Sequence, residues 1–220
     1  IVLCEVQNSD GSDHESNSRA QLRKLSKTAK EQEFWWGFEQ EYFVTKDRIP
    51  LGFPQGGYPE PQGLYYCGVG GNQVRARGLV ETHLQTCLGM DIFFTGTNAE
   101  VAIGQWEFQC FAEDTLKACD DLWIARYVLY RLSEEVELDI DISPKPVPGD
   151  WNGSGCHTNY SNKFMREEGG KEWFMKLFDR MKSRHEAHIA GYGKNNDLRL
   201  TGHHETQHIS KFSWGVGDRG

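Results

Sequence analysis

Two glutamates separated by one residue, Glu39 and Glu41, are the first side chains whose spacing suits chemistry. Residues i and i+2 of a strand point to the same face, and two negative charges held so close repel each other unless a cation lies between them. Aromatic residues flank the pair on both sides, which favours burial, and a buried acidic pair requires a partner. The pair is therefore a candidate cation site, and a solvated face of an edge strand is the alternative.

A second acidic pair, Glu100 and Glu107, is spaced for the same chemistry. If residues 101–104 form the turn between two strands, both carboxylates reach one end of a hairpin, and Gln109 shares the face of Glu107. With the first pair and His157, these residues would form a ring of mostly oxygen ligands. Such a ring suits Mg²⁺ or Mn²⁺ rather than Zn²⁺, and the single imidazole slightly favours Mn²⁺. The hypothesis requires segments far apart in the sequence to meet in space.

His157 follows a bend rich in glycine and proline within residues 145–161. Glycines accept positive φ and let main-chain N–H groups approach a ligand closely. A histidine leaving such a bend is placed to bind a metal or a phosphate. The alternative is an ordinary turn with a satisfied histidine.

The residues from His204 to His208 spell H-E-x-x-H, the string of zinc peptidases. That chemistry requires a helix, so that both histidines lie on one face. A glycine precedes the string and alternating residues follow it, which favours a loop that carries a mobile Glu205. Two arginines, Arg199 and Arg219, flank this segment, and beside a metal centre they would clamp a carboxylate or phosphoryl group.

Hydrophobic periodicity predicts the elements that must position these residues. Expected strands cover residues 1–6, 34–45, 92–97, 105–111, 138–142 and 156–161, and expected helices cover residues 16–33, 79–88, 116–136 and 170–189. Strands that alternate with helices, and that include a hairpin, predict an α+β fold with one sheet backed by helices on one side.

Composition limits the classes of function. The chain of 220 residues has a net charge of −8, which argues against a nucleic-acid binder because phosphates require a basic face. No apolar run approaches the ~20 residues needed to span a bilayer. The six cysteines include no C-x-x-C pair, so we expect reduced, buried thiols in a cytoplasmic protein. The chain lacks an initial Met and a closing element, so we expect one partial domain over residues 1–220 with both ends cut.

Four blocks of this sequence, taken in order, resemble the glutamine synthetase family in the variant shared by eukaryotes and some bacteria (class II). The blocks are residues 37–42, 98–109, 145–161 and 199–206. The resemblance covers nearly the whole chain, and it implies a curved antiparallel sheet backed by helices, the catalytic domain of that family in truncated form.

The resemblance also implies a role for each candidate residue. One divalent ion would be held by Glu41, Glu100 and Glu107, and a second by Glu39 and His157. Glutamate would contact Asp150, Trp151, Asn152, Gly153 and Arg199. ATP would contact Glu107, Phe108, Gln109, Asn159, Tyr160, Ser161 and Arg219. The catalytic residues would be Arg199, Arg219 and Glu205, with Glu205 on a flap over the site.

The implied reaction is the ATP-dependent ligation of ammonia to the γ-carboxylate of L-glutamate through γ-glutamyl phosphate. Two or more Mg²⁺ or Mn²⁺ ions would serve as cofactors, in a cytoplasmic homo-oligomeric ring that binds neither nucleic acid nor membrane. Two alternatives remain open: a ligase that uses another amine on the same fold, and a diverged ring subunit without catalytic activity.

Overall fold

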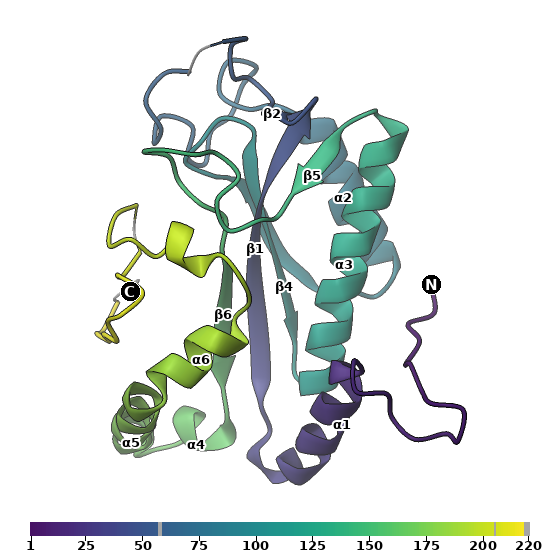
Figure 1. Cartoon of the computed structure of the whole chain (residues 1–220), viewed down its shortest axis with the longest axis vertical. Coiled ribbons are helices and arrows are strands. Elements are labelled where there is room, and N and C mark those ends of the chain that lie inside the picture. Colours follow the sequence, from purple (N-terminus) through teal and green to yellow (C-terminus); the bar gives the residue numbers. More distant parts are fainter. Residues whose placement is uncertain (57–58, 205, 218–220) are drawn as a thin grey trace.

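Within residues 1–56, 59–204 and 206–217, which the structure describes, a six-stranded antiparallel sheet forms the centre of this computed structural model (Figure 1). The strands are β1 (Trp35–Lys46), β2 (Ile49–Pro50), β3 (Phe94–Ala99), β4 (Gln105–Ala112), β5 (Asp139–Asp141) and β6 (Cys156–Ser161). The long strand β1 pairs with β2, β4, β5 and β6, whereas β3 pairs with β4. Every chemistry-bearing strand of the sequence is therefore attached to β1 directly or through β4.

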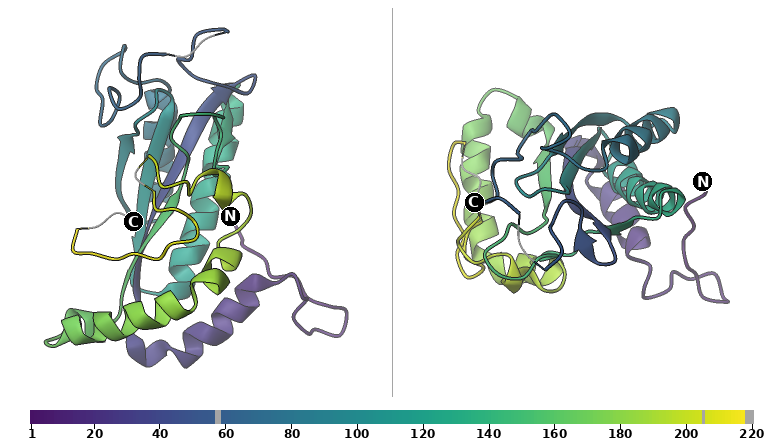
Figure 2. Two further views of the ribbon diagram at one scale, coloured as in Figure 1. Left: turned by 60° about the vertical axis from the view of Figure 1, so that its left-hand side comes forward. Right: turned by 90° about the horizontal axis from the view of Figure 1, so that it is seen from above.

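Helices lie behind this sheet and beyond its β6 edge. They are α1 (Ser18–Thr28), α2 (Arg77–Gly89), α3 (Thr115–Glu135), α4 (Lys163–Arg166), α5 (Gly170–Ser183) and α6 (His185–Gly191), with 3-10 turns η1 (Lys30–Gln32) and η2 (Asn196–Leu198). Helices α2 and α3 pack against each other and back the sheet through β1, β3 and β4. Helices α5 and α6 lie beyond β6, on the side away from α2 and α3 (Figure 2). The predicted α+β class is confirmed.

The core lies between the sheet and helices α2 and α3. Alternate residues of β1, namely Phe38, Tyr42 and Val44, are buried there with Phe108 of β4. Because strand side chains alternate between faces, the residues between them, including Glu39 and Glu41, point to the opposite face. We call that opposite surface of β1, β4 and β6 the front face.

Most predicted elements are confirmed, one is wrong and one is interrupted. The apolar residues 1–6 form no strand: they run outside the sheet, and Ile1 and Val2 are 69% and 84% exposed. Ile1 and Val2 line a shallow groove with Trp123 on α3 instead. The helix predicted over 170–189 is broken at Arg184, whose backbone (φ −120°, ψ 17°) leaves the helical region.

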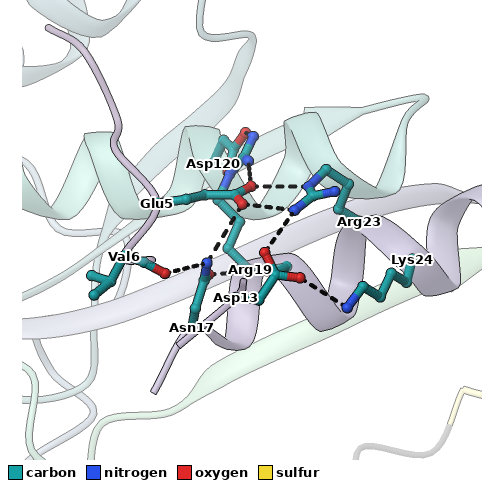
Figure 3. Close-up of polar contacts among 9 residues, drawn as sticks. Glu5, Val6, Asp13, Asn17, Arg19, Arg23, Lys24 and Asp120 are labelled. Carbon is teal, nitrogen blue, oxygen red and sulfur yellow. Dashed lines mark hydrogen bonds and ion pairs between the residues drawn. The ribbon is translucent and has the colours of Figure 1, made fainter. Parts of the chain in front are cut away.

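Ion pairs join the N-terminal segment to α1, and α1 in turn to α3 (Figure 3). Glu5 binds Arg19 and Arg23 of α1, and Arg19 also donates to Asp120 of α3 at 2.7 and 2.8 Å. Asn17 caps the start of α1 by accepting from the Ala20 N–H at 3.1 Å. We call the set of Glu5, Asp13, Arg19, Arg23, Lys24 and Asp120 the N-terminal ionic cluster.

The thiols agree only in part with the sequence prediction. Cys87 and Cys110 are buried as small apolar residues, whereas Cys4 and Cys67 are exposed, and all six cysteines are free. In the part of the chain that the structure describes, no helix is both long enough and apolar enough to cross a bilayer.

Candidate metal and substrate site

Three carboxylates from three different places in the chain meet on the front face. One oxygen each from Glu41, Glu100 and Glu107 lies within 4.8 Å of the others. The register of β1 and β4 sets Glu41 directly opposite Glu107, and the tight turn from β3 into β4 brings Glu100 back toward the same end. The predicted convergence of the two acidic pairs is confirmed for these three residues.

Burial makes this arrangement electrostatically unfavourable without a cation. Glu100 and Glu107 are each only 7% exposed. Loss of water raises the pKa of Glu41 and of Glu100 to about 7, and neighbouring carboxylates add to both shifts. Burial also raises the pKa of Glu107. A divalent cation among the three oxygens would reverse this penalty, because it favours the charged form of each ligand.

The remaining two candidate ligands, Glu39 and His157, lie next to this group on the front face, since Glu39 is two residues before Glu41 on β1. Glu39 is opposite His157 of β6 and opposite Gln109 of β4. Its Oε1 accepts from Asn159 Nδ2 at 2.6 Å, and His157 is exposed. The structure therefore brings all five predicted ligands onto one face of neighbouring segments, with Glu39 and His157 beside the tighter group of three.

The glycine-rich bend closes over Glu41 and leaves room for Arg199. The N–H of Gly155 donates to Glu41 Oε2. A Cβ atom at Gly155 would lie 2.7 Å from a guanidinium nitrogen of Arg199, and one at Gly153 would lie 2.8 Å from Arg199 Cγ. At Gly153 an added Cβ would also lie 2.4 Å from the Pro144 carbonyl oxygen, so only glycine fits there, whereas at Gly155 it would displace the guanidinium of Arg199. The charge of Arg199 opposes the rise in the pKa of Glu41.

The candidate substrate loop, residues 150–153, is anchored by its tryptophan. Trp151 is 9% exposed and packs on Phe53 with ring centroids 5.0 Å apart, in a small apolar cluster with Phe43 and Val147. The neighbouring Gly153 carbonyl accepts from Gln105 Nε2 at 3.0 Å. The buried indole ring of Trp151 thus holds the loop in place by packing.

A chain of hydrogen bonds ties this loop to the segment before Glu205. The Asn152 N–H donates to Gln62 Oε1 at 2.8 Å, so the amide nitrogen of Gln62 faces His204 Nδ1 at 3.0 Å. Since that nitrogen donates, Nδ1 accepts and the proton of neutral His204 lies on Nε2. The Nε2–H then donates to Asp150 Oδ1 at 2.7 Å.

This geometry rules out the peptidase interpretation for the described residues. Thr201 and His208 form an isolated antiparallel bridge, not a helical turn. His204 and His208 bond to Asp150 and to Ser210 respectively, so they do not share one face. Glu205 and Arg219, two of the predicted catalytic residues, lie outside the described residues.

The candidate nucleotide residues divide between two faces. Asn159 and Ser161 share the front face with His157, and Gln109 donates to Glu107 there. Phe108 points into the core and is fully buried. Tyr160 points away from the front face and packs on Trp36, with ring centroids 5.4 Å apart. Its hydroxyl donates to Met181 Sδ at 3.4 Å. Only the main chain of Phe108 and Tyr160 is left to face the site.

Sequence reasoning missed two residues that support the front face. Gln40 lies between the paired glutamates, and Arg126 lies on α3 behind the sheet, yet their side chains bond to each other. Strand alternation placed Gln40 on the core side, but no pattern in the sequence pointed to Arg126 as its partner.

Comparison with known proteins agrees with this geometry. The fold and the site define a class of protein: an α+β domain with an open sheet whose front face carries a group of carboxylates. A family model described as "Glutamine synthetase, catalytic domain" matches residues 15–195. The chain belongs to the glutamine synthetase family.

Individual relatives cover the whole chain. It is 48% identical to "Glutamine synthetase" of Agaricus bisporus, 46% identical to "Glutamine synthetase cytosolic isozyme" of Pinus sylvestris and 48% identical to "Glutamine synthetase 1, mitochondrial" of Drosophila melanogaster. All of this chain is covered in each case, but only 62%, 63% and 56% of those relatives. The chain thus spans less than two thirds of their length.

Solved structures show the same fold. The glutamine synthetase of Plasmodium falciparum, solved by cryo-electron microscopy, superposes with a TM-score of 0.73 at 18% identity, over 92% of this chain and 47% of that one.

Proposed function

We propose that this chain supplies the catalytic face of an ATP-dependent ligase that joins ammonia to the γ-carboxylate of L-glutamate through γ-glutamyl phosphate. The observation that carries the proposal is the convergence of Glu41, Glu100 and Glu107, with Glu39 and His157 beside them. The family, and the relatives that are named glutamine synthetase, support the choice of this reaction.

The donor set fits hard divalent cations. Three carboxylates deprived of water offer oxygen ligands to one ion, and a carboxylate with one imidazole offers a second position. We propose Mg²⁺ or Mn²⁺ at both. When bound, these ions would neutralise the γ-phosphate charge of ATP during transfer.

The chain's own residues would bind and orient the substrates. Arg199, whose guanidinium lies beside Glu41 and Gly155, would bind the α-carboxylate of glutamate, with Asp150, Asn152 and the main chain of Trp151 and Gly153 lining the same subsite. Gln109, Asn159 and Ser161, with the main chain of Phe108 and Tyr160, would border ATP.

Two residues outside the described part complete the proposal. Arg219 would face the transferred phosphoryl group. Glu205 would attract ammonium, accept the proton that it must lose before attack, and help to keep water from the acyl phosphate.

The wider setting is also a proposal. Residues 1–220 would form one unit of the catalytic domain within a homo-oligomeric ring, and the protein would act in the cytoplasm, as the name of the Pinus relative indicates for that protein. The net charge of −8 argues against nucleic acid as a partner.

The test measures glutamine formed from glutamate, ATP and ammonium in the full-length protein, with Mg²⁺ and with Mn²⁺. Glu107→Gln should abolish product and Mn²⁺ binding, whereas Glu81→Gln, an exposed position on α2, should keep both. If the full-length protein is inactive on ammonium but active on methylamine, the substrate is an alkylamine and not ammonia. Absence of ATP-binding heat in calorimetry would instead indicate a ring subunit without catalysis.

A further inference from the structure

Gln40 connects the front face of the sheet with the helix behind it. In sequence it lies between the candidate ligands Glu39 and Glu41, but strand alternation points its side chain toward the core, where it is 2% exposed. A buried amide must have its donors and acceptor bonded, because water cannot reach them.

The partners of Gln40 come from opposite sides of the molecule. Its Oε1 accepts from Arg126 of α3, from Nε at 2.8 Å and from a terminal guanidinium nitrogen. Its Nε2 donates to the carbonyl oxygen of Glu41 at 2.7 Å and of Gly155 at 3.2 Å. The orientation of the amide is thereby fixed, since a guanidinium only donates and a carbonyl only accepts.

The Gly155 main chain carries this constraint to the front face. Its carbonyl accepts from Gln40 Nε2 and from the Glu41 N–H at 3.0 Å, while its own N–H donates to Glu41 Oε2. An unbroken series of hydrogen bonds therefore runs from the Arg126 guanidinium to the Glu41 carboxylate.

Arg126, the donor to Gln40, is a half-buried side chain. Among the described residues it forms no ion pair. Its charge is directed at the Gln40 amide, and its guanidinium lies 5.6 Å from the centroid of Trp123. Hydrogen bonds from a charged donor are roughly twice as strong as neutral ones, so this contact holds the amide firmly.

We propose that Arg126 is a positioning residue for the front-face metal site, acting through Gln40 and Gly155 to hold the Glu41 carboxylate toward Glu100 and Glu107. The inference rests on the proposed function, in which Glu41 is a metal ligand. Without the guanidinium, Gln40 Oε1 is a buried acceptor with no donor, and its amide cannot turn over because Nε2 already faces two carbonyls. The amide must shift, and Gly155 and Glu41 shift with it.

The experiment measures the Kd for Mn²⁺ by calorimetry, without nucleotide, in the full-length protein and its variants. Arg126→Met should raise the Kd about tenfold, at the low end of the effect of outer-shell partners. Arg126→Lys keeps one donor toward Gln40 Oε1 and should raise it only about threefold. The control is Arg131→Met on the same helix, where the side chain is 54% exposed, and its Kd should stay unchanged.

The outcomes separate the inference from the proposed function. A Kd unchanged in R126M, or raised equally in R126M and R131M, overturns the positioning role. If R126M does not fold, R126K decides, and a Kd equal to that of the unsubstituted protein overturns the inference. If the unsubstituted protein binds no Mn²⁺, the proposed metal site itself is wrong.

Discussion

Two clusters of carboxylates in this molecule are built in opposite ways. In the N-terminal ionic cluster every acid meets a base: hydrogen bonds from Arg23 and Arg19 hold the pKa of Glu5 at about 2. On the front face, burial raises the pKa of Glu41 and Glu100 to about 7, and the charge of Arg199 opposes the shift of Glu41.

The difference teaches how a fastening contact is distinguished from a binding site. Opposite charges that pair with one another fix segments in place and require nothing further. Like charges gathered where water is excluded cost free energy, and the fold tolerates that cost when a ligand from outside removes it. The imbalance of charge, more than the number of acids, is what supports the proposed cation site on the front face.

The strongest way to break this comparison is to remove one front-face carboxylate. Glu100→Gln should weaken Mn²⁺ binding by more than ~100-fold, beyond the effect of outer-shell changes, because a direct ligand is lost. The metal-free variant should also be more stable above pH 7, since one buried charge is gone. Calorimetry and thermal unfolding measure the two effects.

The matched control is Asp13→Asn in the N-terminal ionic cluster. It should leave the Mn²⁺ Kd unchanged and should not stabilise the protein at any pH. Equal Mn²⁺ affinity in Glu100→Gln and the unsubstituted protein would contradict the assignment of the front face.

Acidity should act on the two clusters in opposite directions. Glu41 and Glu100 have raised pKa values in the folded state, so the stability that their protonated forms contribute is complete below about pH 4.5 and is lost as the pH rises through about 7. Glu5 has a lowered pKa, so its contribution is present above about pH 4.5 and is lost as the pH falls toward 2.

Melting temperatures of the metal-free protein between pH 3 and pH 8 provide the measurement. In the unsubstituted protein the Tm should decrease as the pH rises from about 5 to about 7, and Glu100→Gln should make this decrease smaller. Glu5→Gln should make smaller the decrease in Tm that occurs as the pH falls below about 4.5. Mn²⁺ affinity should rise over the same upper range, because the ligands must release protons to bind. Curves of identical shape for both variants would contradict the contrast.

A smaller effect is expected from filling the space that Arg199 occupies. Gly155→Ala would place a methyl group 2.7 Å from the Arg199 guanidinium, so the flexible end of that side chain must move away. The KM for glutamate should therefore rise roughly tenfold. Gly71→Ala is the control, since no atom lies within 4 Å of its added Cβ. An unchanged KM in Gly155→Ala would mean that Arg199 does not contribute to glutamate binding.

The smallest effect should come from the N-terminal ionic cluster. Arg19→Met removes the contacts to Glu5 and Asp120 and should lower the Tm by about 1–2 °C, since ion pairs that water still reaches are weak. The decrease should disappear in 1 M salt, where charges are screened. A loss of Mn²⁺ binding in this variant would show that the two clusters are coupled, against the comparison drawn above.

The sequence predicted the front face better than it predicted the periphery. Strand alternation and a short hairpin turn are local rules, and they were enough to bring Glu41, Glu100 and Glu107 together. The residues 1–6 were misread because an apolar run has the same pattern in a buried strand as in a segment lying on exposed aromatic residues of α3. The break in the helix at Arg184 could not be predicted, because no glycine or proline lies at that position.

Contacts between distant side chains were beyond sequence reasoning. The bond from Arg126 to Gln40 depends on how α3 crosses the back of the sheet, which no residue pattern specifies. The same holds for the stem of Arg199 across Gly153 and Gly155: the glycines were visible, but the side chain that needs their space was not.

Strand β1 is hydrogen-bonded along both edges, to β4 on one and to β5 and β6 on the other. Main-chain amides in such a strand exchange their hydrogens with solvent only when the whole domain opens. Glu39 and Glu41 thus project from the most protected backbone in the sheet, while the candidate substrate loop is held mainly by side-chain contacts, among them the packing of Trp151 on Phe53. Heating or mild denaturant should therefore release substrates well before it disperses the cation ligands.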